Sequence, residues 1–511
     1  MARPGFVLEI DERTPPLVVP DGDGFRLERF PLGTRVVYPA DALPPVPSVT
    51  EAISAALDAP LGSEPLASRL HPGMTLTLAF DDLSTPVPRM HRPDVRGRIL
   101  EAVLTRAARA GVDDVEVVCA RGLNRRLTEA ELLHLVGERV FRSFFADGRL
   151  THHDAEDADR LTTVGSTELG ETRVNASAAR SDLLVFVHVA TAPGDGGVRA
   201  VARGLGSTSV IGALTPSPSA PDVAAEVLGQ IDAAVPVFAV EAVLDNALFA
   251  APWDFLGKRE WEWRVQDRAL SGGLRRGLGL VSHKTRRRVL NSAQAGYGVL
   301  RITGGDPAPV AEASRQQLLA QQLVEVPAQA DVGIVGVPDT TPFSVGSTTN
   351  PVLAAWQGLS ATFGAHTGRP VVRPGGALIL YHPMRPDFSG LHHPSFVDFF
   401  ADVLPTTTDP AQIAEKFEAT FAGDAWYSHL YRTSFAFHGV LPFHLWYELS
   451  AVRAHCGDVI WVGADRPSVD RLGFRTASTL ADALEIVSST VGRSPSITYL
   501  HHPPALVADV R

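Results

Sequence analysis

The fold class is decided by residues 74–123, MTLTLAFDDLSTPVPRMHRPDVRGRILEAVLTRAARAGVDDVEVVCARGL. Two short apolar runs within it, Met74–Phe80 and Val115–Ala120, have the length and composition of buried strands. Between them, Val95–Ala110 has apolar residues at positions 99, 100, 103, 104, 107 and 108, which is the stripe of an amphipathic helix. Strand, helix and strand in this order predict a parallel βαβ unit and therefore an α/β protein.

The same alternation returns later in the chain and predicts a second domain. Asp182–Val189 is a further buried strand of the first unit, and the pattern restarts at Ala330–Val337. A chain of 511 residues is also too long for one ordinary core. We expect two α/β, Rossmann-like domains with a cleft between them. Their predicted bounds are 1–322 for the first domain with a basic insertion at 251–300, 323–485 for the second, and 486–511 for a tail that either stays there or returns to the first domain.

The composition excludes several functional classes. The net charge is −11 and the pI is about 5.9, which argues against a general binder of nucleic acid or of anionic membranes. The sequence contains no signal peptide and no apolar run of membrane-spanning length. Cys119 and Cys456 are too few for a disulfide framework, so we expect a cytoplasmic protein.

Residues 251–300 fit neither unit. They carry ten Lys and Arg residues against four Asp and Glu residues, and they include the run Lys284–Arg288. One interpretation is a solvated helical insertion. The other is a clasp over an anionic ligand or over a neighbouring subunit of a homo-oligomer.

Ligands of open parallel sheets bind at the carboxyl ends of the strands, where the loops diverge. Asp82 follows the first strand directly, where it could bind a ligand or cap the turn at Ser84 and Thr85. Arg121 and Arg125 crowd one loop after the next strand. Arginine forks suit carboxylates and phosphates, so these residues indicate an anionic small-molecule substrate, although a salt-bridged surface loop has the same composition.

Two further groups of residues could bind a cofactor or a metal. Gly196 and Gly197 follow the strand at 182–189, and glycines there let the backbone approach a phosphate or simply form a turn. The spacing is not that of a dinucleotide-binding loop. His382, His392 and His393 lie close in sequence, so a histidine-ligated metal is one hypothesis and ordinary packing histidines are the other.

Six fragments in a fixed order resemble the nickel-dependent lactate racemase family: AFDDLSTPVPR (79–89), CARGLNRRLT (119–128), HHDAED (152–157), GDGGVRAVARGLGS (194–207), ITGGDPAP (302–309) and RPGGALILYHP (373–383). The resemblance implies two α/β domains with the active site between them. It also implies a nickel pincer nucleotide that is bound covalently by a lysine and ligated by a histidine. The pincer takes a hydride from a 2-hydroxy acid while two histidines move the hydroxyl proton, and the hydride returns to either face.

Several family positions hold the family's residue, whereas others do not. Asp82, Pro86, Pro88, Gly122, Leu123, Arg125, Thr128, Gly196 and Gly197 match the family pattern. Thr85 stands in place of an arginine, and Asn124 stands in place of the first catalytic histidine. His188 is the nearest candidate for the second histidine. Arg199 aligns with the lysine that carries the pincer, and a guanidinium is a very poor acyl acceptor. Residues 214–217 offer no nickel ligand, and Leu353, Ala354 and Gln357 replace the family's Tyr-Gln-x-x-Lys pattern.

The sequence therefore predicts a divergent isomerase that acts on a small 2-hydroxy acid or a related carboxylate. Its catalytic candidates are Asp82, Asn124 and His188, and its substrate-binding candidates are Arg121 and Arg125. Gly196, Gly197 and Arg199 are the cofactor-binding candidates, although the arginine contradicts covalent attachment of a pincer. The alternatives are a non-catalytic binding or assembly protein on the same scaffold, and a histidine-ligated metalloenzyme of another reaction type.

Overall fold

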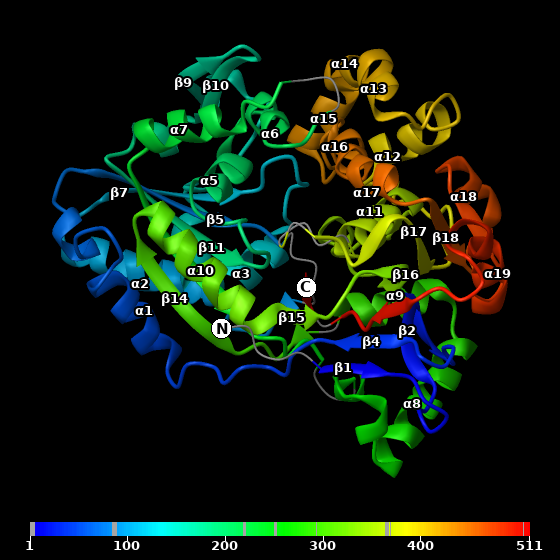
Figure 1. Ribbon diagram of the computed structural model, residues 1–511. Coiled ribbons are helices and arrows are strands. Elements are labelled where there is room, and N and C mark those ends of the chain that lie inside the picture. Colours follow the sequence, from blue (N-terminus) through cyan, green and yellow to red (C-terminus); the bar gives the residue numbers. More distant parts are fainter. Residues whose placement is uncertain are drawn as a thin grey trace.

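The computed structural model describes residues 6–83, 89–217, 221–249, 253–292, 294–362, 367, 369–503 and 505–511. It confirms an α/β protein with two parallel sheets, which lie in the two halves of Figure 1. Thr85, Pro86 and Pro88, and the turn at Ser84 and Thr85, lie outside the described residues. No helix in the described ranges is long and apolar enough to cross a membrane.

The first sheet contains the βαβ unit predicted from residues 74–123. Its strands run in the order β14–β12–β11–β5–β7–β8, and all are parallel except β14, which is antiparallel to β12. The bounds are β5 Thr75–Asp81, β7 Asp114–Ala120, β8 Leu150–His152, β11 Leu183–Ala190, β12 Val237–Leu244 and β14 Val299–Gly305. The strands β5 and β11 lie side by side at the centre, so their carboxyl ends open onto one edge.

Helices cover both faces of this sheet. One face packs against α1 (Val49–Asp58), α2 (Val95–Arg109) and α3 (Glu129–Phe144). The other face packs against α5 (Val198–Leu205), α7 (Ala224–Ala234) and α10 (Pro307–Gln322). The stripe predicted for 95–110 is thus buried as expected, because Ile99, Leu100 and Val103 are fully enclosed.

The second sheet differs from the predicted domain bounds at both ends of the chain. Its main order is β1–β4–β20–β16–β17–β18–β19, and β2 pairs with both β16 and β3. The bounds are β1 Phe6–Glu9, β2 Leu17–Gly22, β3 Gly24–Glu28, β4 Arg35–Tyr38, β16 Ala330–Pro338, β17 Val372–Tyr381, β18 Asp458–Val462, β19 Arg475–Ala477 and β20 Ile497–Leu500. Residues 6–38 therefore belong to the second sheet rather than to a first domain that begins at residue 1. Short apolar strands can complete either sheet, so their composition does not fix which one they join.

The tail contacts both units. The strand β20 lies inside the second sheet, whereas β21 (Val507–Val510) pairs with β15 (Leu323–Val326). The side chain of Asn246, in the first unit, donates a hydrogen bond to the Ala505 carbonyl oxygen at 3.1 Å. Helices α11 (Pro351–Thr362) and α19 (Leu480–Val491) pack on the second sheet, and α16 (Leu441–Glu448) packs on α11.

The basic insertion packs against the second sheet. It contains α8 (Val265–Leu280) and α9 (His283–Ser292), and α8 projects from the lower right of the molecule in Figure 1. Phe255 and Trp263 pack on Val18 of β2. Glu260 is 1% exposed and accepts hydrogen bonds from the Val18 amide, the Tyr38 hydroxyl and His501 Nε2. The insertion is therefore part of the core at its start, whereas much of α8 and α9 is solvent-exposed.

Candidate functional site

His188 lies at the carboxyl edge of the first sheet, between two carboxylates. Its Nδ1 is 3.1 Å from Asp81 Oδ2, and its Nε2 is 3.5 Å from Asp195 Oδ1. Asp81 is the last residue of β5, His188 is near the end of β11, and Asp195 lies in the loop that follows β11. Two adjacent apolar strands thus bring His188 and the Asp81 carboxylate together. The loop after β11 folds back and places the Asp195 carboxylate on the other side of the ring.

The charges of this cluster determine its protonation. Burial alone would lower the pKa of His188, but Asp195 and Asp81 raise the pKa well above its ordinary value. Burial would raise the pKa of Asp195, and the adjacent His188 together with the amides of Thr191 and Ala192 lowers it. At neutral pH the cluster is therefore an imidazolium between two carboxylates.

Asp81 also accepts hydrogen bonds from Arg96 of α2 and from the backbone of β11. Arg96 Nε donates to its Oδ1 at 2.5 Å, and the Val189 amide donates to its Oδ2 at 2.9 Å. Arg96 in turn forms an ion pair with Asp94, the residue that caps α2, at 3.1 Å. The buried arginine therefore fixes Asp81, whereas Asp195, besides its contact with His188, accepts hydrogen bonds from the Thr191 and Ala192 amides of its own loop.

The glycine loop is close to this cluster. Gly197 precedes α5 and has a φ of +63°, and its amide donates to Glu241 Oε1 at 2.6 Å. Glu241 lies beside His188 in the register of β12 against β11 and is 1% exposed. Gly196 and Gly197, the predicted cofactor-binding glycines, thus surround a carboxylate of this chain. Arg199 follows in the first turn of α5 and is partly buried.

The two predicted substrate-binding arginines are occupied by internal partners. Arg121 is 1% exposed, donates to the carbonyl oxygens of His153 and Asn124, and stacks over the Tyr431 ring at 3.9 Å. Arg125 forms an ion pair with Glu131 at 2.7 Å and donates to the Val345 carbonyl oxygen. Both side chains join the two halves of the molecule, because their partners come from distant parts of the chain.

Arg121 also lines a hollow of about 580 Å³ beside β8, together with Arg126, His152, Asp154, Arg160 and Arg432. This pocket is polar and contains four arginines. It lies at the β8 end of the sheet, so β5 and β7 separate it from His188. Asp82 is buried directly after Asp81, and Asn124 lies partly exposed in the loop that contains Arg121.

The three histidines predicted to bind a metal do not converge. His393 donates to the Phe343 carbonyl oxygen through Nε2 and stacks on Phe437, while the His392 ring lies 6.3 Å away. His382 is instead paired with Asp339. Among the described residues, no group of three or more His, Cys, Asp or Glu side chains could hold a metal ion. All three lie in the connection between β17 and α12, but His382 is at its start and His392 and His393 are at its end, so proximity in sequence does not bring their rings together.

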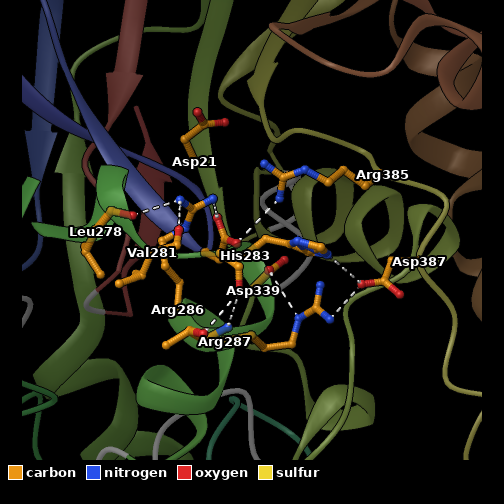
Figure 2. A network of polar contacts seen from close by, with 12 residues as sticks. Asp21, Leu278, Val281, His283, Arg286, Arg287, Asp339, Arg385 and Asp387 are labelled. Atoms are coloured by element: carbon orange, nitrogen blue, oxygen red, sulfur yellow. Dashed lines mark hydrogen bonds and ion pairs between the residues drawn. The ribbon is translucent and has the colours of Figure 1, made fainter. Parts of the chain in front are cut away.

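The carboxyl edge of the second sheet is covered by α9 (Figure 2). Arg287 is 2.9 Å from Asp387 and 3.8 Å from Asp339, which follows β16. Arg286 is 3.1 Å from Asp23, in the turn between β2 and β3, and donates to the Leu278 carbonyl oxygen. The basic run of the insertion therefore neutralises acidic residues at the strand ends of its own chain.

Sequence reasoning does not identify two residues of the first edge, Asp195 and Glu241. Asp81 directly precedes the predicted Asp82 at a strand end, and Asp195 directly precedes the predicted glycines Gly196 and Gly197. Glu241 was not considered, although it is the one charged residue in the apolar strand VFAVEAVL (237–244). A lone charge inside a buried strand requires a partner, and that signal could have identified it.

Comparison with known proteins identifies the scaffold. A model of the lactate racemase N-terminal domain matches residues 26–214. The fold is similar to the lactate racemase apoprotein from Thermoanaerobacterium thermosaccharolyticum, with a TM-score of 0.62 and 16% identity over 96% of this chain and 99% of that chain. A protein from Thermotoga maritima aligns with a TM-score of 0.48 and 12% identity over 91% of this chain and 97% of that chain. No curated protein sequence matches. Residues 26–214 therefore match the lactate racemase N-terminal domain, and the fold is similar to that of the lactate racemase apoprotein over almost the whole length of this chain.

Proposed function

We propose that the protein is a racemase or epimerase that acts on a small 2-hydroxy acid or a related carboxylate at the carboxyl edge of the first sheet. The observation that supports this proposal most directly is the position of His188 between Asp81 and Asp195. Charged, partly accessible groups at the end of central parallel strands are the usual setting of a catalytic site.

The contact between His188 Nε2 and Asp195 is the reactive part of the cluster. At 3.5 Å it is longer than a good hydrogen bond, and the His188 Nε2 atom is buried without a hydrogen-bond partner among the described residues. A substrate carboxylate oxygen placed there would accept a hydrogen bond from His188 Nε2, and Asp195 would take the proton from C2 as a general base. The electron pair of the broken C2–H bond would pass into the carboxylate as an enediolate, and solvent would return a proton to either face of C2. Asp81 would hold the ring in place through Nδ1, since Arg96 fixes that carboxylate. We retain Asp82 as the further carboxylate that orients the substrate.

The residues present do not fit the nickel pincer nucleotide of the family. The first lysine of the chain is Lys258, and Arg199 stands at the attachment position. The glycine loop encloses the Glu241 carboxylate rather than open space. We therefore assign no step to that cofactor, and the proposal rests on proton transfer to Asp195 with His188 as the hydrogen-bond donor.

Exchange of the C2 hydrogen tests the proposal. The purified protein is incubated in D₂O with a panel of 2-hydroxy acids of both configurations, and loss of the C2–H signal is followed by ¹H NMR. We expect exchange and inversion with at least one acid, and a large loss of rate in His188→Gln. His71→Gln, a substitution of an exposed histidine of the same domain, is the matched control. Absence of exchange with every acid would refute the isomerase.

A non-catalytic binding protein is the second candidate. It is favoured by the 580 Å³ pocket beside β8, whose arginines suit an anionic ligand and which lies apart from His188. Calorimetric titration of the same acids distinguishes the two functions. Binding that persists in His188→Gln and is lost in Arg160→Met, without any C2 exchange, would establish the binding protein.

A further inference from the structure

The glycine loop before α5 already holds an anion that belongs to the chain. Glu241 Oε1 accepts a hydrogen bond from the Gly197 amide at 2.6 Å, and the side chain is 1% exposed. Its second oxygen, Oε2, is buried and has no hydrogen-bond partner among the described residues. A carboxylate with one oxygen on a backbone amide and one oxygen unsatisfied occupies the loop as a bound anion would.

The backbone is shaped around this carboxylate. A Cβ atom built on Gly196 would lie 2.4 Å from Glu241 Oε1, so only glycine permits the approach. Gly197 needs its glycine for a different reason, because its φ is +63°. The loop leads directly into the eight-residue helix α5, whose first amides and dipole favour negative charge at this end.

We propose that Glu241 is a built-in anion that closes this cradle to phosphate-bearing ligands. A phosphate that entered the loop would have to displace the carboxylate from the Gly197 amide or lie against it. Two anions at such short distance in a buried setting repel strongly. The cradle therefore retains the shape of a phosphate site, and the chain fills it with its own side chain. This inference does not depend on the isomerase activity.

Removal of the carboxylate tests the proposal. Inorganic phosphate is titrated into the wild type, Glu241→Ala and Glu241→Gln by isothermal calorimetry. Glu241→Ala empties the cradle, whereas glutamine keeps an acceptor of the same size in it. We expect Glu241→Ala to bind phosphate with a Kd at least tenfold lower than the wild type and Glu241→Gln. Equal binding by the wild type, or no gain in folded Glu241→Ala, would overturn the proposal.

A second measurement remains decisive if Glu241→Ala does not fold. The Gly197 amide is followed by NMR in protein labelled with ¹⁵N-glycine, in the wild type and in Glu241→Gln. An amide bonded to a carboxylate has a strongly downfield proton, so the neutral variant should move this resonance upfield. An unchanged Gly197 resonance would show that Glu241 does not ligate the loop, and the proposal would fail.

Discussion

The two sheets each place a histidine and an aspartate at their carboxyl edge, but the two pairs differ in what their protons can do. His382 is 2% exposed, accepts from the Met384 amide through Nδ1 and contacts Asp339 through Nε2 at 2.8 Å. Both ring nitrogens are thus committed to this chain. His188 instead has a carboxylate on each side, and its Nε2 contact is loose at 3.5 Å.

The cover over each edge reinforces this difference. Over the second edge, α9 places Arg286 and Arg287 on the acidic strand ends (Figure 2). Over the first edge, the glycine loop is held by Glu241 and leaves His188 partly accessible. The histidine–aspartate pair is therefore structural in the second domain, where both ring nitrogens of His382 have close partners. In the first domain the pair is available for chemistry, because the Nε2 contact of His188 is loose.

The sharpest test of this contrast substitutes each of the two histidines in turn. We expect His188→Gln to lower the C2 exchange rate by at least about 100-fold, which is the usual contribution of an acid–base group. We expect His382→Ala to leave the exchange rate of the folded protein unchanged and to lower the free energy of unfolding by about 2 kcal/mol, because two buried groups lose their partners. NMR exchange and urea denaturation give the two readouts. The same loss of activity from both variants would remove the distinction.

The second edge should depend on Arg287 for stability. Its removal leaves Asp339 and Asp387 without that cation, and loss of one partner of a buried pair costs about 3 kcal/mol. We therefore expect Arg287→Met to lower the free energy of unfolding by about that amount in urea titration. Arg288→Met, at the exposed neighbouring position, is the control and should stay within about 0.5 kcal/mol. Equal effects would mean that α9 is not fixed by its buried arginine.

The first edge should respond to alkaline pH. The pKa of His188 is raised in the folded protein, so its contribution to stability is complete below the unfolded value of about 6.5. That contribution is lost as the pH rises toward the folded pKa, by up to about 1.4 kcal/mol for each pH unit. Thermal unfolding between pH 6 and pH 9 should show this decline in the wild type and a flatter curve in His188→Gln. The same pH dependence of stability in the wild type and in His188→Gln would contradict a protonated His188 in the folded protein.

Salt should produce the smallest effect, and only at the second edge. The contact between Arg385 and Asp23 at 3.4 Å is partly exposed, since the arginine side chain is 41% accessible. Exposed pairs contribute only a few tenths of a kcal/mol and are screened at 1 M salt. Hydrogen exchange of residues 283–292 should therefore accelerate by about twofold in 1 M NaCl, whereas that of residues 198–205 should not change. An equal acceleration of both segments would indicate general loosening instead.

Local patterns in the sequence predicted much of the fold. The strand at 74–80 and the helix at 95–110 appear as β5 and α2, because their apolar spacing already specifies which side is buried. The placement of residues 6–38 could not be predicted, since a short apolar strand does not encode its partner. In the structure, Thr498 of β20 pairs with Arg35 of β4, which is determined only by the complete fold.

The site was predicted in outline and not in its contacts. The strand-end rule predicts the glycine loop at the carboxyl edge of the first sheet, because that rule depends only on parallel topology, whereas His188 is predicted from the family resemblance. Arg121 and Arg125 have a composition that suits an anion, but their partners are carbonyl oxygens and a carboxylate of this chain. Such partners come from loops whose path the sequence does not reveal. Glu241 is the opposite case. Its charge within an apolar strand can be read from the sequence, but its partner, the Gly197 amide, cannot.

The N-terminal strands of the second sheet have a consequence for synthesis on the ribosome. Residues 75–305 contain every strand of the first sheet, so that sheet can form while translation continues. The strand β4, made first, must wait for β20 near residue 500 before it gains its parallel neighbour. Contacts of such long sequence separation form late and slowly. Residues 6–38 therefore complete their place in the second sheet only after almost all of the chain has been made.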